Sequence, residues 1–498
     1  MDKFAMIIFG ASGDLTKRKL MPALYSLFGD KRLTGEFIIL GVGRTVYTDE
    51  SYRSYILEEL QHFLKSEEQD LELMTSFVTH LFYLPMDPAE AEGYSLLRQR
   101  LIELTNDINP NNLLFYLATP PSLYGVVPLH LKEAGLNTSG ARIIVEKPFG
   151  YDLESARELN RIYASVFDER QIYRIDHFLG KETAQNVLAF RFANGIFEPL
   201  WNRNYIDYVE VTAVENLGIE QRGGFYETAG ALRDMVQNHL IQLVALTAME
   251  PPAIFNADNF RNEVVKVYES LTPLNEIDLN EHIVRGQYTA SGNKKGYREE
   301  RGVAPDSRIE TYIAMKLGIS NWRWSGVPFY IRTGKQMPTK VTEIVVHFRE
   351  TPHQMFRCSG GNCPRANKLI LRLQPNEGIV LKIGMKVPGA GFEVRQVTMD
   401  FSYADLGGVP GGDAYARLID DCIQGDATLF TRSDAVEASW RFFDPVLRFW
   451  SDTPNAPLYG YPAGTWGPLE SEVMMHEHGA EWTNPCKNLK HTEQYCEL

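Results

Sequence analysis

A short apolar run, a glycine-containing turn and a helical pattern follow one another at the start of the chain. The run covers residues 6–9, Gly10 and Gly13 stand in the turn, and the helical pattern continues through residues 15–20. In parallel-sheet folds this arrangement binds a dinucleotide pyrophosphate, because glycines let the backbone approach the phosphates and the helix N-terminus attracts them. Only two of the usual three glycines are present, so a tight turn without a ligand is an equal alternative for this run alone.

Apolar runs and helix-like segments alternate through the first third of the chain, which predicts βαβ units and a parallel sheet. After about residue 180, strand-like stretches are separated by turns and a few helices, which predicts an antiparallel sheet with helices on one face. We therefore predict an α/β domain over residues 1–176 and a larger α+β domain over residues 177–498. The expected strands are residues 4–9, 37–42, 113–117, 143–146 and 171–175 in the first domain, and 208–214, 343–348, 369–373 and 379–383 in the second.

The charge balance argues against nucleic acid as a partner. The 498 residues include 50 Lys and Arg against 64 Asp and Glu, a formal net charge of −14, whereas nucleic-acid-binding domains are usually basic. The apolar runs are far shorter than the roughly 20 residues that cross a bilayer, and the N-terminus does not resemble a signal peptide. We expect a cytoplasmic protein that binds neither nucleic acid nor membrane.

The five cysteines are an odd and sparse set, which predicts reduced thiols rather than a disulfide framework. His347, His353, Cys358 and Cys363 form one cluster that raises the question of zinc. Structural zinc ligands normally come in tight knuckles, and the spacing here is looser. We therefore favour a surface loop and predict no metal.

The second predicted strand is followed closely by Arg44, where NAD enzymes usually place an acidic residue for the ribose hydroxyls. An acid there would repel a 2′-phosphate, whereas a guanidinium pairs with it through two parallel hydrogen bonds. Arg44 therefore favours NADP, with NAD as a secondary cofactor. A solvated charge at the end of a strand is the alternative.

Three polar residues, Asp176, His177 and Lys181, follow the strand expected at residues 171–175. They should emerge at the carboxyl edge of the parallel sheet, where open α/β folds bind ligands. Together they offer an acceptor, a titratable donor and a fixed cation. A solvated charged turn is the alternative.

His239 lies on the apolar stripe of a helix expected over residues 230–243, so its imidazole should point inward. A lone inward histidine is more often a core residue than a base.

Lys147 precedes Pro148 at the end of a strand, which favours an extended backbone there. Lys335 and Lys340 flank a turn after a strand-like stretch at residues 328–331. On an acidic chain such a local cluster of basic residues would bind an anionic substrate. The alternative is that these are ordinary surface lysines, above all Lys340.

Taken together, these segments closely resemble the glucose-6-phosphate dehydrogenase family. The matching strings occur in order over nearly the whole chain, and several of them are rare outside that family. They are GASGDL at residues 10–15, EKP at 146–148, RIDH at 174–177, DMVQNHL at 234–240, NWRW at 321–324 and GVPFYIRTGK at 326–335.

The resemblance implies a Rossmann-type domain followed by a large antiparallel sheet used for dimer formation, in a homodimer or homotetramer. It implies oxidation of β-D-glucose 6-phosphate at C1 to 6-phospho-D-glucono-1,5-lactone with hydride transfer to NADP, the first step of the oxidative pentose phosphate pathway. His239 matches the general base and Asp176 the carboxylate that holds its imidazole. The substrate-binding positions are Lys147, His177, Phe178, Lys181, Glu215, Asp234, Lys335 and Lys340, and the cofactor-binding positions are Gly10, Ala11, Ser12, Gly13, Asp14, Leu15, Lys17, Arg44, Tyr124 and Lys147.

Phe178 departs from the family pattern, which usually has Tyr after the phosphate-binding His. Because this hydroxyl is missing, we predict that the binding free energy of the substrate is weaker by about 1 kcal/mol, the contribution of a typical net hydrogen bond.

Two other functions stay open. An oxidoreductase acting on an unphosphorylated sugar would not need His177 together with Lys181. A redox-sensing binding protein that has lost catalysis would not need Asp176 together with His239.

Overall fold

The computed structural model describes residues 4–33, 36–105, 112–353, 355–358, 366–389, 391–406 and 413–485. The chain divides into two compact units. The first unit comprises Met1–Lys181, Ile254–Arg261 and Gly411–Glu437, and the second comprises Glu182–Ala253, Asn262–Pro410 and Ala438–Leu498.

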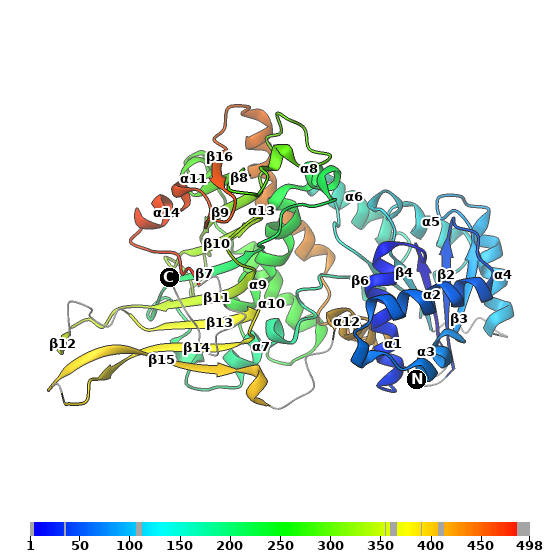
Figure 1. The fold of residues 1–498 in the computed structure, drawn as a ribbon, viewed down its shortest axis with the longest axis horizontal. Coiled ribbons are helices and arrows are strands. Elements are labelled where there is room, and N and C mark those ends of the chain that lie inside the picture. The colour runs from blue at the N-terminus through cyan, green and yellow to red at the C-terminus, as the bar shows by residue number, and fades with distance from the viewer. Residues whose placement is uncertain are drawn as a thin grey trace. The chain divides into compact units, whose positions relative to one another are not determined.

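The first unit contains a six-stranded parallel sheet in the order β3-β2-β1-β4-β5-β6 (Figure 1). This is the doubly wound order, in which successive strands are added toward one edge from β1 to β3 and toward the other edge from β4 to β6. β1 and β4 are buried along their whole length because helices cover both faces of such a sheet. The strands are β1 (Phe4–Phe9), β2 (Phe37–Gly43), β3 (Leu81–Pro85), β4 (Leu113–Leu117), β5 (Arg142–Val145) and β6 (Ile172–Arg174).

The helices of the first unit begin at clear capping signals where the sequence supplies them. Asp152 accepts a hydrogen bond from the Ser155 amide at 2.8 Å, and Thr48 accepts one from the Ser51 amide at 3.2 Å. The 3₁₀ and π helices are labelled η. The helices are η1 (Thr16–Leu20), α1 (Met21–Gly29), α2 (Asp49–Phe63), η2 (Ser66–Glu68), α3 (Leu71–Val78), α4 (Gly93–Thr105), η3 (Pro121–Leu123), α5 (Val126–Glu133), α6 (Leu153–Ala164), η4 (Glu169–Gln171) and α12 (Ala414–Gln424).

The second unit contains a ten-stranded mixed sheet in the order β12-β15-β14-β13-β11-β7-β10-β9-β8-β16 (Figure 1). Its pairs are antiparallel except for β10 with β7, β12 with β15 and β16 with β8. The strands are β7 (Ile206–Val214), β8 (Ile283–Thr289), β9 (Tyr312–Leu317), β10 (Phe329–Gly334), β11 (Val341–Phe348), β12 (Arg357–Cys358), β13 (Lys368–Gln374), β14 (Gly378–Lys386), β15 (Glu393–Ser402) and β16 (Tyr459–Pro462).

The remaining helices include η6, which contacts the central strands β7 and β10. Every residue of the central strand β10 is buried, whereas the residues of β15, next to the edge strand β12, are partly or fully exposed. These helices are α7 (Glu182–Phe192), η5 (Glu198–Leu200), α8 (Gly223–Ala231), η6 (Leu232–Leu240), α9 (Ile241–Ala248), α10 (Ala257–Glu269), α11 (Glu276–Glu281), η7 (Tyr297–Glu299), η9 (Tyr403–Leu406), α13 (Ser433–Asp452) and α14 (Leu469–His476).

The predicted fold class is confirmed, and every predicted strand is present within a few residues. The edge strand β3 was not predicted, because its half-buried pattern lacks the continuous apolar run of the central strands. The helix expected over residues 230–243 is not one regular helix. Gly230 leaves the helical conformation with φ +64° and ψ 177°, η6 then has π-type hydrogen bonding, and α9 follows. Among the described helices, none is long and apolar enough to cross a membrane.

Candidate active site

The turn after β1 requires glycine at its first position. Gly10 has φ +86°, and a Cβ atom placed there would lie 2.2 Å from the carbonyl oxygen of Ala118, just beyond β4. The Gly10 amide donates to the Val42 carbonyl at 2.9 Å, and the Gly13 amide donates to the Gly10 carbonyl at 2.9 Å. The turn is therefore held at the carboxyl ends of β1 and β2, beside the point where the strand order reverses.

The predicted cofactor positions after this turn lie on η1 or close to it. Ser12 and Thr45 are joined through their hydroxyl oxygens at 3.2 Å, so the segment that contains Arg44 lies beside the turn. Arg44 itself is exposed. Lys17 pairs with Glu59 at 3.5 Å, and Asp14 is exposed. Ala11 is fully buried and Leu15 half-buried, so these two contribute backbone and packing rather than charge.

The carboxyl end of β5 carries Glu146 and Lys147. The Tyr116 hydroxyl donates to Glu146 at 2.5 Å. The pKa of Glu146 is raised to about 7, mostly by burial and in part by the nearby Asp176 carboxylate, while the Tyr116 hydrogen bond and the Lys147 charge oppose the shift. Lys147 and Asp176 therefore both lie near Glu146. Tyr124, a predicted cofactor position, is buried, and burial raises the pKa of its phenol.

This raised pKa predicts a pH-dependent effect of Glu146→Gln. Between pH 4.5 and pH 7 the folded chain keeps a proton on Glu146 that the unfolded chain loses, so the free energy of unfolding contributed by this residue falls as the pH rises. The glutamine variant should lack that fall, and its melting temperature relative to the unaltered chain should increase across this window. Thermal melts at a series of pH values measure it.

Glu90→Gln is the matched control, because Glu90 is an exposed glutamate of the same unit. It should leave the pH profile unchanged. Parallel profiles for the Glu146 variant and the unaltered chain would contradict the buried-carboxyl explanation.

The segment after β6 brings Asp176, His177, Phe178 and Lys181 together. Asp176 is buried and accepts a hydrogen bond from the Phe178 amide at 2.9 Å, which closes a tight turn. The Lys181 ammonium lies 4.2 Å from the centre of the Phe178 ring, and the His177 ring meets the same ring edge-on at 5.1 Å. Phe178 is thus the apolar support of the residues predicted to hold a phosphate.

The second unit brings together three predicted residues from distant parts of the sequence. Lys335, at the end of β10, forms an ion pair with Glu215 and lies 3.6 Å from the Asp234 carboxylate. The Glu215 amide donates to the Gly334 carbonyl at 2.9 Å, so the parallel pairing of β7 with β10 places Glu215 beside Lys335. Lys340 is exposed just before β11.

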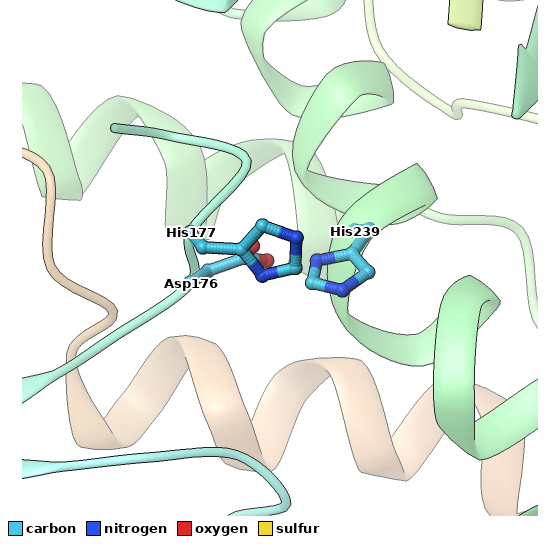
Figure 2. A group of neighbouring side chains, drawn as sticks. All are labelled: Asp176, His177 and His239. Atoms are coloured by element: carbon cyan, nitrogen blue, oxygen red, sulfur yellow. The ribbon is translucent and has the colours of Figure 1, made fainter. Parts of the chain in front are cut away.

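His239 lies on η6, one π-helical turn beyond Asp234, and its side chain is buried as its place on the apolar stripe predicts. Figure 2 shows the His239 imidazole extending from this helix, and the Asp176 and His177 side chains extending from the segment after β6. The Asn238 side-chain oxygen accepts a hydrogen bond from the His239 amide at 2.6 Å. A buried imidazole on a helix held against the central strands can serve as a base of defined orientation.

One further group beside the predicted residues of each unit has no signal in the sequence pattern. Glu146 takes its raised pKa from burial beside Tyr116, which no local spacing predicts. Glu310, described below, contacts η6 from a segment about 80 residues away.

His347 of the predicted Cys/His cluster has a structural role. Its ring stacks on Tyr208 at 3.9 Å, and its Nε2 atom lies 2.5 Å from a carboxylate oxygen of the buried Glu210. His353 is exposed. Cys363 and the side chain of Cys358 lie outside the described residues.

Comparison with known proteins covers both halves of the chain. Residues 7–186 match the family model "Glucose-6-phosphate dehydrogenase, NAD binding domain", and residues 188–483 match "Glucose-6-phosphate dehydrogenase, C-terminal domain". The chain is 50% identical to the glucose-6-phosphate 1-dehydrogenase of Aggregatibacter actinomycetemcomitans over 493 residues, 97% of this chain and 98% of that protein. It is 45% identical to the enzyme of Treponema pallidum (strain Nichols), over 99% of this chain and 97% of that protein.

Solved structures agree with these matches. A glucose-6-phosphate dehydrogenase in complex with its substrate glucose-6-phosphate has a TM-score of 0.89 and 36% identity, covering 97% of this chain and 98% of that one. The enzyme from Mycobacterium avium has a TM-score of 0.84 and 37% identity, with the same coverage of both chains.

Proposed function

Because this chain belongs to the glucose-6-phosphate dehydrogenase family, we propose that it oxidises C1 of β-D-glucose 6-phosphate to 6-phospho-D-glucono-1,5-lactone with NADP as the hydride acceptor. The observation that carries the proposal is the match of both halves of the chain to this family, together with the solved relative that binds glucose 6-phosphate. This oxidation would be the first step of the oxidative pentose phosphate pathway.

The first unit is the family's nicotinamide-dinucleotide-binding domain, and its turn after β1 suits the cofactor. At Gly10 no side chain intervenes between the turn and the strand ends, and the helix that follows carries Lys17 on its first turn. When bound, the nicotinamide supplies the acceptor for the hydride from C1. Gly10, Ala11, Ser12, Gly13, Asp14, Leu15, Lys17, Arg44, Tyr124 and Lys147 would hold the dinucleotide. The exposed Arg44 beside the turn supports NADP, since a guanidinium pairs with a 2′-phosphate.

The residues of the proposed reaction have separate tasks. His239 takes the proton of the C1 hydroxyl while hydride leaves C1, so that the C1–O bond becomes the lactone carbonyl. Asp176, by the family resemblance, holds the imidazole and stabilises the imidazolium. His177 and Lys181 bind the 6-phosphate. Lys147, Glu215, Asp234, Lys335 and Lys340 bind the sugar or fix the geometry of the site.

The test is an absorbance assay at the reduced-nicotinamide band, with purified protein, glucose 6-phosphate and either NADP or NAD at matched concentrations. Rapid reduction of NADP is expected. Reduction of NAD alone would overturn the assignment of NADP, and equal rates with glucose and glucose 6-phosphate would favour the enzyme of an unphosphorylated sugar. No reduction of either cofactor would overturn the proposal in favour of a binding protein.

The proposal includes a homodimer or homotetramer in the cytoplasm, with the domain boundary between residues 176 and 177. Support for self-association comes from exposed apolar side chains on β14 and β15 or on the segment between them, since large exposed apolar patches often mark interfaces. These are Met385, Phe392, Met399 and Phe401, which are between 40% and 76% exposed.

Phe178→Tyr is expected to lower KM for glucose 6-phosphate about fivefold, the equivalent of about 1 kcal/mol for one net hydrogen bond. The added hydroxyl would extend from a ring that already supports His177 and Lys181. Steady-state kinetics measure the change, and KM for the dinucleotide serves as the internal control. An unchanged KM for the sugar phosphate would show that this hydroxyl makes no substrate contact in this chain.

A further inference from the structure

The start of η6 is held by a residue from another segment. Glu310 lies two residues before β9, and both its backbone and its side chain accept hydrogen bonds from η6. Its carbonyl oxygen accepts from the Ala231 amide at 3.0 Å, and its carboxylate accepts from the Leu232 amide at 3.1 Å. Ala231 occupies the N-cap position of η6 and has no side chain that could cap the helix. Glu310 therefore supplies the cap that the helix itself lacks.

Gly230 leaves room for this carboxylate. A Cβ atom at Gly230 would lie 2.3 Å from the Glu310 Oε1 atom, and the positive φ of Gly230 is strained for any other residue. A side chain at position 230 would therefore take the space that the Glu310 carboxylate fills. Only glycine at position 230 is compatible with the capping contact as it stands.

Glu310 also lies next to the strand that carries Lys335. The carbonyl oxygen of the following residue, Thr311, accepts a hydrogen bond from the Lys335 amide at 2.9 Å. Two consecutive residues thus contact the helix of Asp234 and His239 on one side and the backbone of Lys335 on the other. Glu310 is buried, and burial raises its pKa, while the Leu232 amide, Arg285 and Arg233 oppose the shift.

We infer that Glu310 is a positioning residue of the active site, which sets the start of η6 so that Asp234 meets Lys335 and His239 is presented in one orientation. The carboxylate acts through the helix, by accepting the hydrogen bond of the Leu232 amide. The inference rests on the proposed function for its catalytic consequence, whereas the capping itself is independent of it.

The test compares Glu310→Ala with Glu310→Gln and with Glu227→Ala. The alanine variant removes the side-chain cap, whereas glutamine keeps an oxygen that can accept from the Leu232 amide. Glu227 is the matched control, because its carboxylate binds Tyr297 at 2.6 Å and Ser307 at 2.7 Å in the segment that leads to Glu310. Amide hydrogen exchange over residues 229–242 reports on the helix, and kinetics report on the site.

Glu310→Ala should speed exchange over residues 229–242 and lower kcat/KM for glucose 6-phosphate about tenfold, the equivalent of a lost cap of roughly 1.4 kcal/mol. Affinity for the dinucleotide should be unchanged, and Glu310→Gln should stay within about threefold of the unaltered chain. If Glu310→Ala does not fold, Glu310→Asp should give the same faster exchange, because the shorter side chain withdraws the carboxylate from the Leu232 amide.

Unchanged exchange over this segment, an equal effect of Glu227→Ala or an equal loss in Glu310→Gln would overturn the inference. A chain that is inactive before any substitution would contradict the proposed function alone. The exchange measurement would still decide whether Glu310 positions the helix.

Discussion

Replacing His239 by Asn is expected to lower kcat for glucose 6-phosphate by ~10² to 10⁴, the usual contribution of a positioned general base. Asparagine can occupy the buried position on η6 and form hydrogen bonds, but it cannot accept a proton near neutral pH. Dinucleotide binding should persist, because the turn after β1 belongs to the first unit. Reduced-nicotinamide absorbance gives the rate, and equilibrium titration of the cofactor checks binding.

His282→Asn is the matched control for this prediction. His282 lies in the same unit, is half-buried and contacts Asp278 at 2.9 Å, yet has no place in the proposed reaction. It should change kcat little. Retained turnover in the His239 variant would refute its assignment as the base, and an equal loss in both variants would point to a general structural effect of replacing histidines.

Lys335→Met is expected to destabilise the second unit by about 3 kcal/mol and to abolish most of the activity. Breaking a buried ion pair by removing one partner typically costs ~3–5 kcal/mol, because a charge is left uncompensated in the interior. Asp234 loses a nearby cation in the interior, since its side chain is only 5% exposed. Glu215 is 38% exposed and can regain water, which is why we expect the lower end of that range. The denaturation midpoint measures the change.

The double variant Lys335→Met/Asp234→Asn distinguishes the effect of the buried Asp234 charge on stability from the effect of the lost lysine side chain. Removing the Asp234 charge as well should recover a large part of the lost stability without recovering activity, because the proposed sugar contacts are absent in both variants. Lys340→Met is the control for stability, since an exposed lysine usually contributes within about 0.5 kcal/mol. A Lys335 variant as stable as the unaltered chain would show that Asp234 does not depend on this cation.

Much of the fold could be predicted from local pattern. Continuous apolar runs such as β1 and β4 identify strands buried on both faces, and the 3.6-residue period identifies the inward position of His239. β3 escaped prediction because an edge strand buries only alternate side chains, a weak signal in five residues. The π-helical form of η6 also escaped, since it depends on the kink at Gly230 and on a cap from another segment.

The sequence by itself determined the parallel sheet, the glycine turn after β1 and the residue types that could perform the chemistry, because these depend on neighbours a few positions apart. Only the tertiary structure decided which of those residues meet. Glu215, Asp234 and Lys335 are joined because β7 pairs with β10 in one register and η6 contacts both strands. Likewise, Glu310 reaches Leu232 because of that packing. Contacts across about 80 to 120 positions depend on register and burial, which local spacing does not encode.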